Sequence, residues 1–113
     1  MKQVWFSGMH SDVGGGYAEQ QLSDIALEWL RREAEVSGLL IYGNHKVTTD
    51  PDADGKIHDS RDGLGRMYRK KPRRLDERIL KARVHQAVLD RAAGSGNRYQ
   101  PWILGQAYDI EPL

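Results

Sequence analysis

Residues 4 to 17 read Val-Trp-Phe-Ser-Gly-Met-His-Ser-Asp-Val-Gly-Gly-Gly-Tyr. The apolar residues that end at Phe6 are of types enriched in β-strands, and Gly8 interrupts the run. The three consecutive glycines allow positive φ angles and close backbone approaches that residues with a Cβ atom rarely adopt. This stretch therefore predicts a short strand followed by a glycine-rich functional loop that extends to Gln21.

An amphipathic helix is expected immediately after this loop. Ser23 is the expected N-cap, and Gly38 is the expected stop signal. The apolar residues of this segment follow the i, i+3, i+4, i+7 spacing of one helical face, at Leu22, Ile25, Ala26, Trp29 and Leu30. A strand, a loop and such a helix predict an α/β arrangement, with a core built from Trp5, Phe6, Ile25, Trp29 and Leu30.

The rest of the chain carries weaker signals. Residues 39–42 fit either a second short strand or a buried connection, and residues 44–66 are polar and predicted to be irregular. A second helix is expected within residues 76–93, and the tail from residue 99 onward is expected to be extended and packed over another element. The face of that second helix would contain Leu80, Val84 and Val88.

Composition limits the function classes. The chain has 113 residues, 39% of them hydrophobic, so its length suits one domain or part of a larger one. No apolar run reaches the roughly 20 residues that a membrane-spanning helix needs. The absence of cysteine excludes disulfides, thiolate metal sites and cysteine nucleophiles. A net charge of +1 makes nucleic acid an unexpected partner, and the chain is expected to be cytoplasmic in the cell that makes it.

His10 is the candidate catalytic residue of the glycine-rich loop. It follows the predicted strand, at the edge where open α/β sheets place catalytic groups, and the ordinary pKa of histidine suits proton transfer near neutral pH. Asp12 could accept a backbone N–H or bond the His10 imidazole. The residues alone leave a second interpretation open, in which His10 only caps a turn and the glycines serve a tight bend.

Residues 4–17, continued by residues 22–29, resemble the α/β-hydrolase family that includes type VI secretion phospholipase effectors, many of whose members are uncharacterised. Residues 57–60 (Ile-His-Asp-Ser), 72–74 (Pro-Arg-Arg), 84–91 and 99–101 are similar to later parts of that family. The resemblance implies a bacterial lipid esterase in which His10 is the histidine of a Ser-Asp-His triad, placed after the last core strand. The supporting loop would contain Asp12, Gly14, Gly15 and Gly16.

The sequence departs from this family in one respect that matters for activity. The 113 residues contain no Gly-x-Ser-x-Gly elbow, so the serine and the orienting acid would come from a segment upstream of Met1. We therefore expect residues 1–113 to be a single partial domain, the C-terminal portion of an α/β-hydrolase, with no turnover by itself. The alternative is a non-catalytic binding or remnant module that contacts a protein or an anionic lipid surface.

Two charged segments suggest additional sites. Residues 50–55 reproduce the first half of a calcium loop, although position twelve is Arg61 in place of glutamate, so a solvated acidic turn is preferred to calcium and no other cofactor is expected. A basic run near residues 66–74 could bind lipid phosphates, although a solvated surface is preferred. The candidate calcium ligands are Asp50, Asp52 and Asp54, and the candidate anion-binding residues are Arg69, Lys70, Lys71, Arg73 and Arg74.

The expected partners follow from the resemblance and from the partial domain. They are a complementary hydrolase segment or a second copy of the chain, together with a lipid ester as substrate. Secretion as a type VI effector would follow from family membership alone.

Overall fold

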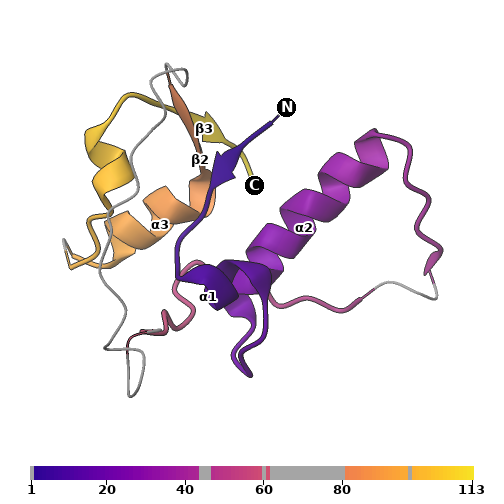
Figure 1. The fold of residues 1–113 in the computed structure, drawn as a ribbon, viewed down its shortest axis with the longest axis horizontal. Coiled ribbons are helices and arrows are strands. Elements are labelled where there is room, and N and C mark those ends of the chain that lie inside the picture. Colours follow the sequence, from indigo (N-terminus) through magenta and orange to yellow (C-terminus); the bar gives the residue numbers. More distant parts are fainter. Residues whose placement is uncertain (1, 44–46, 60, 62–80, 97) are drawn as a thin grey trace.

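The computed structural model describes residues 2–43, 47–59, 61, 81–96 and 98–113. In chain order the elements run from strand to helix and back to strand twice (Figure 1). They are β1 (Val4–Trp5), α1 (His10–Gly14), α2 (Gln21–Val36), β2 (Ala82–His85), α3 (Gln86–Gly94), the 3-10 helix η3 (Trp102–Gly105) and β3 (Tyr108–Glu111).

The three strands form one parallel sheet in the order β1-β2-β3. In the register, Val4 pairs with Arg83, and Val84 pairs with Ile110. Parallel neighbours need crossover connections, and α2 and α3 lie in the two crossovers. The predicted α/β class and the predicted first strand are confirmed. Because β2 and β3 follow β1, however, the expectation that His10 follows the last strand is wrong.

The core consists of two clusters that meet at α3. The first contains Val84 and Val88 with Ala82 and Ile103, and the second contains Leu22, Ile25 and Ala87. Adjacent residues of α3, Ala87 and Val88, therefore belong to different clusters. This helix joins the sheet to the N-terminal part of α2.

The prediction of a helix within residues 76–93 is only partly correct. The spacing of Val84 and Val88 suits a helix, but Ala82 and Val84 are buried while Arg83 between them is exposed, which is the period-2 pattern of a strand. Because β2 pairs with strands on both sides, sheet formation overrides the helical spacing, and α3 begins only at Gln86. Leu80 lies outside the described residues.

The predicted amphipathic helix exists, but its details differ. It begins at Gln21, and Ser23 is not the N-cap because its hydroxyl donates to the carbonyl of Gln20 from inside the first turn. The helix ends as expected before Gly38, which has a φ of 98°. Leu30 was expected in the core and is 59% exposed.

Three connections also differ from expectation. The loop expected up to Gln21 contains α1. Residues 39–42 form neither a strand nor a buried connection, since Leu39, Leu40 and Tyr42 are exposed. The tail is partly extended as expected, because its last segment is the edge strand β3, although η3 precedes that strand.

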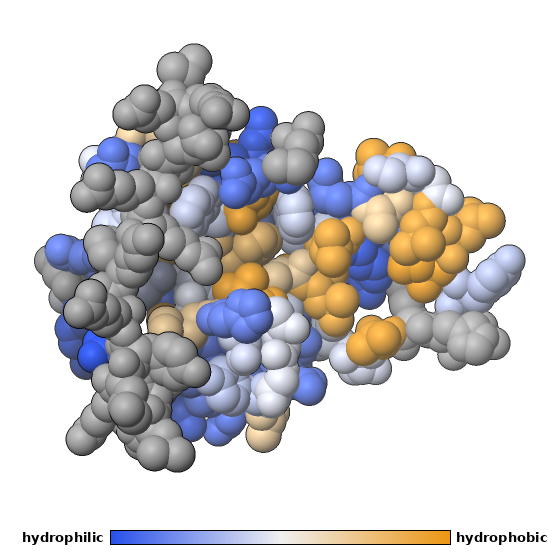
Figure 2. Space-filling view, viewed as in Figure 1, coloured by the Kyte–Doolittle hydropathy of each residue, from blue (hydrophilic) through white to orange (hydrophobic). Residues whose placement is uncertain are grey.

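Large apolar side chains remain uncovered near the C-terminal end of α2. Figure 2 shows them gathered over the C-terminal part of α2 and the segment that follows it. The exposed members of this group are Leu30, Val36, Leu39, Leu40 and Tyr42. Patches of this kind mark surfaces that bind other molecules more often than ordinary solvent-facing surface does.

A buried carboxylate at the end of β3 ties distant elements together. Glu111 accepts hydrogen bonds from the Trp29 indole (3.0 Å) and the Arg83 guanidinium (3.1 Å), and it forms an ion pair with Lys2 (2.7 Å). Burial raises the pKa of this carboxyl, but the bonds from Lys2, Trp29 and Arg83 outweigh burial and lower it to about 2. The N-terminus, α2, β2 and β3 thus converge on one charge, which we call the Glu111 cluster.

Candidate functional site

The first turn after β1 brings the candidate residues into position. Gly8 has a φ of 114°, and a Cβ atom at this position would lie 2.5 Å from the Cβ of Asp12. Only glycine therefore fits between the strand and α1. His10 is the first residue of α1, just beyond the carboxyl end of β1, and it is exposed.

Asp12 is the organising residue of this turn. Its side chain is 1% exposed and accepts the backbone N–H of Met9 at 2.8 Å, which completes a capping box at the start of α1. It also accepts the backbone N–H of His58 at 3.2 Å and lies 2.6 Å from Nδ1 of the same residue. Burial raises the pKa of Asp12, but the bonds from Met9 and His58 outweigh it and lower that pKa.

His58 is held on three sides. Its Nδ1 faces Asp12, its Nε2 lies 3.2 Å from Oε2 of Glu19, and its ring stacks on Tyr17 with centroids 3.8 Å apart. Both ring nitrogens face carboxylate oxygens, and only the protonated imidazole donates from both. We call these four residues, Asp12, Tyr17, Glu19 and His58, the His58 clamp. The clamp fastens the segment around residue 58 to the loop that carries His10.

The prediction for the hydrogen bonds of Asp12 is correct for the backbone and wrong for the histidine partner. Asp12 does accept backbone N–H groups, and it does bond an imidazole, but the imidazole belongs to His58 and not to His10. No side-chain hydrogen bond or ion pair of His10 occurs within the described part of the chain. The sequence contained one signal for His58, the family-like segment at residues 57–60, but nothing in it indicated the partner.

The glycines of the loop serve the return of the chain toward α2. Gly14 ends α1, and Gly15 and Gly16 follow with φ values of 84° and 120°. Residues with side chains rarely adopt these angles. The turn they make leads the chain to Tyr17 and Glu19, which both contact His58.

The acidic turn at residues 50–55 is organised by hydrogen bonds within the protein. The carboxylate of Asp52 accepts the N–H of Asp54 at 2.8 Å, and the N–H of Asp50 donates to Asp24. The Arg91 guanidinium of α3 donates to the carbonyls of residues 53 and 55, at 2.7 and 2.6 Å. Across the ranges that the structure covers, no group of three or more His, Asp or Glu residues is arranged to hold a metal ion.

The proposed anion-binding residues cannot be placed. Arg69, Lys70, Lys71, Arg73 and Arg74 all lie outside the described residues. Among the helices of the described ranges, none is long and apolar enough to cross a membrane.

Comparisons with known proteins cover only part of the chain. Residues 1–33 match the model of the type VI secretion system Tle1-like phospholipase effector catalytic domain. A stretch of 37 residues is 49% identical to the uncharacterized protein YEL023C of Saccharomyces cerevisiae and covers 28% of this chain but only 5% of the yeast protein. No solved structure matches. The N-terminal segment of the chain is thus similar to part of a phospholipase effector catalytic domain.

Proposed function

We propose that this chain is the histidine-bearing portion of a serine hydrolase that cleaves lipid esters, and that it is inactive without a segment supplying the serine. The observation that carries the proposal is the match of residues 1–33 to a phospholipase effector catalytic domain, which includes His10 and its loop. The rest of the α/β-hydrolase fold, and secretion of the protein as a type VI effector, belong to the same proposal.

The surroundings of His10 support a role as proton carrier. The imidazole is exposed at the carboxyl end of a parallel strand, where a nucleophile from another segment can approach it. As general base it would take the proton of the serine hydroxyl while the oxygen attacks the ester carbonyl. It would return that proton to the leaving alcohol, and water would then release the acyl group by the same route.

Asp12 has a different part in this proposal. Its oxygens are occupied by Met9 and His58, so it is unsuited to orient His10. The orienting acid of the triad would come from the same external segment as the serine. Asp12 and the His58 clamp would hold the loop in the shape that presents His10.

The test is reconstitution with the reading frame upstream of this one, provided that frame encodes a Gly-x-Ser-x-Gly elbow. The chain alone should not hydrolyse a phospholipid or an activated ester, whereas the two polypeptides together should. His10→Ala should lower the activity of the complex by at least about a thousandfold, since removal of a triad member has effects of that size. Ser11→Ala, at the neighbouring position of α1, is the matched control and should retain activity.

Two results would contradict the proposal. Ester hydrolysis by the purified 113-residue chain would disprove its inactivity alone, and a complex whose activity survives His10→Ala would remove His10 from the chemistry.

A second function is favoured by the exposed apolar group near the end of α2. In this alternative the chain is a non-catalytic module that binds a protein through Leu39, Leu40 and Tyr42, which are 53%, 79% and 70% exposed. A stable complex with the upstream polypeptide that has no hydrolase activity, and that is lost in Leu40→Asp, would support this alternative over the first.

A further inference from the structure

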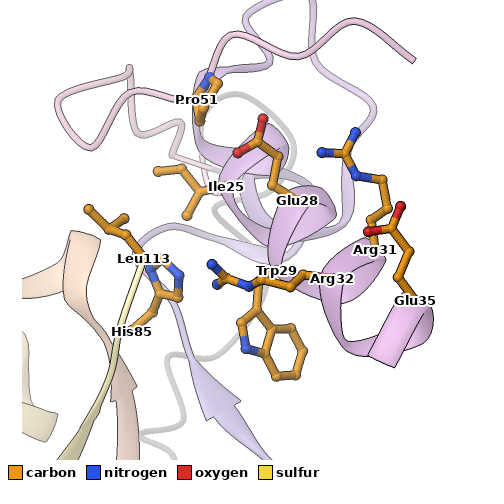
Figure 3. Close-up of a pocket in the computed structure, with 9 residues that line it drawn as sticks. All are labelled: Ile25, Glu28, Trp29, Arg31, Arg32, Glu35, Pro51, His85 and Leu113. Carbon is orange, nitrogen blue, oxygen red and sulfur yellow. The ribbon is translucent and has the colours of Figure 1, made fainter. Parts of the chain in front are cut away.

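A cavity of about 230 Å³ lies between α2 and the carboxyl end of β2 (Figure 3). It shares no residue with the His58 clamp. The apolar residues in its lining are Ile25, Trp29, Pro51 and Leu113. α/β sheets commonly bind ligands at the carboxyl ends of their parallel strands, so the polar groups of this cavity are candidate ligand contacts.

His85 is the buried polar group of the cavity. It is 2% exposed and stacks on Phe6, with ring centroids 4.9 Å apart. Its Nδ1 accepts the backbone N–H of Ala87 at 3.3 Å, so in the neutral ring the proton is on Nε2. Burial, followed by the nearby charge of Arg32, lowers the pKa of His85 and favours this neutral form.

Nε2 of His85 is a donor that needs an acceptor. None of the described residues accepts a hydrogen bond from it. In these ranges every fully enclosed side-chain nitrogen or oxygen has a hydrogen-bond partner, so Nε2 is not fully enclosed. Since Nε2 is thus not fully enclosed and His85 lines the cavity, we infer that the Nε2–H group faces the cavity. A buried donor in such a position is satisfied by water or by a ligand.

Arg32 supplies a second donor at the same end of the cavity. Its guanidinium points toward the His85 ring in Figure 3, and one of its nitrogens donates to the carbonyl of Pro112 at 3.3 Å. The carboxylates of Glu28 and Glu35, which also line the cavity, point away from His85 in the same view. Glu28 accepts a hydrogen bond from Thr49. Arg32 is exposed, so water can solvate its guanidinium, whereas His85 is buried; an oxyanion placed between the two N–H donors would accept from both.

We propose that this cavity binds a small oxyanion with an apolar tail, held by His85 and Arg32 at the head and by the neighbouring lining residues Ile25 and Leu113 along the tail. The volume is below the range of roughly 300–1,000 Å³ that is usual for drug-sized ligands, so the ligand is small. A short fatty acid and an alkyl phosphate share the required chemistry. The two donors bind the head in either case, and the apolar lining residues favour a ligand with an alkyl chain over a bare ion.

The experiment is a titration of the purified chain with hexanoate, hexyl phosphate and inorganic phosphate, followed through the ring signals of His85 by NMR. At least one of the two alkyl compounds should shift these signals saturably and bind more tightly than inorganic phosphate. The one that binds more tightly identifies the source of the oxyanion as carboxylate or phosphate.

Two variants test the donors. Arg32→Gln should weaken binding by about tenfold or more, the usual effect of losing a charged hydrogen bond. Arg31→Gln is the matched control. Arg31 also lines the cavity, but its guanidinium points away from His85 in Figure 3, so its loss should change the affinity less than about twofold. His85→Asn, followed through the indole N–H signal of the cavity residue Trp29, should also weaken binding, while the asparagine oxygen can still cap α3 and preserve the fold.

Three results would overturn the proposal. They are no binding of any of the three compounds to the folded chain, an affinity for inorganic phosphate that equals or exceeds the affinities for both alkyl compounds, and equal losses in the Arg31 and Arg32 variants.

Discussion

The Glu111 cluster and the His58 clamp are each centred on a buried carboxylate, but they join different parts of the protein. Each is built on a buried carboxylate whose pKa is lowered by the groups that bond it. Glu111 bonds an indole, a lysine and an arginine, none of which changes its charge near neutral pH. Asp12 instead bonds two backbone N–H groups and one imidazole.

The two clusters also differ in which parts of the fold they join. The partners of Glu111 come from the N-terminus, α2 and β2, so the cluster fixes the arrangement of the whole sheet. The clamp instead joins two connecting segments beside His10. The comparison predicts a large stability effect at Glu111, a smaller one at Asp12, and almost none at His10.

The largest effect is expected for Glu111→Gln. A pKa lowered from 4.5 to about 2 corresponds to about 3 kcal/mol of stabilisation at neutral pH, and most of it should disappear with the charge. Urea unfolding followed by tryptophan fluorescence measures the loss. Asp109→Asn on the same strand is the control, because that side chain is 52% exposed and its ion pair with Lys81 should contribute less than about 1 kcal/mol.

Acid should remove the difference between wild type and Glu111→Gln. The folded-state pKa of Glu111 is below its ordinary value, so its stabilisation is complete above about pH 4.5 and is lost as the pH falls toward 2. A difference that stays constant over this range would show that the Glu111 charge does not stabilise the fold, and the Glu111 cluster would lose its special status.

An intermediate effect is expected for Asp12→Asn. Asparagine can accept from the Met9 N–H but cannot pair as a charge with the His58 ring, so the free energy of unfolding should fall by about 1–3 kcal/mol. The pKa of Asp12 is lowered from 3.8, so this contribution should be complete above pH 3.8 and be lost as the pH falls below 3.8 through the lower pKa of the folded state. Wild type and variant should therefore converge in acid.

The control for Asp12→Asn is Asp59→Asn, next to His58 but exposed. Equal stability losses in the two variants would mean that the clamp has no particular importance. A loss in Asp12→Asn that is undiminished below pH 3.8 would instead assign its effect to packing.

Sequence reasoning succeeded where the determining forces are local. The β-favouring run up to Phe6 predicted β1, and the apolar spacing from Leu22 with the stop at Gly38 predicted most of α2. It failed at β2, where Val84 satisfied a helical spacing and only pairing with β1 and β3 decides for a strand.

The polar clusters were not predictable for a related reason. Asp12 and His58 are 46 residues apart, and Trp29 and Glu111 are 82 apart. Hydrogen bonds between residues so far apart in the sequence form only in the assembled fold and leave no periodic pattern in the sequence. His10 became a candidate because its glycine-rich context is contiguous in the sequence, whereas the finding that Asp12 bonds His58 and not His10 required the geometry.

The smallest effect is expected for His10→Ala. His10 is exposed, and its side chain makes no hydrogen bond or ion pair within the described ranges, so the free energy of unfolding should change by less than about 0.5 kcal/mol. His58→Ala, measured in the same urea titration, should cost clearly more, because it removes the partners of Asp12 Oδ1 and of the Tyr17 ring. A large loss in His10→Ala would make this histidine part of the scaffold, and its effect on hydrolysis would no longer report on proton transfer. A neutral result leaves a folded protein in which any lost activity of the reconstituted complex belongs to the imidazole itself.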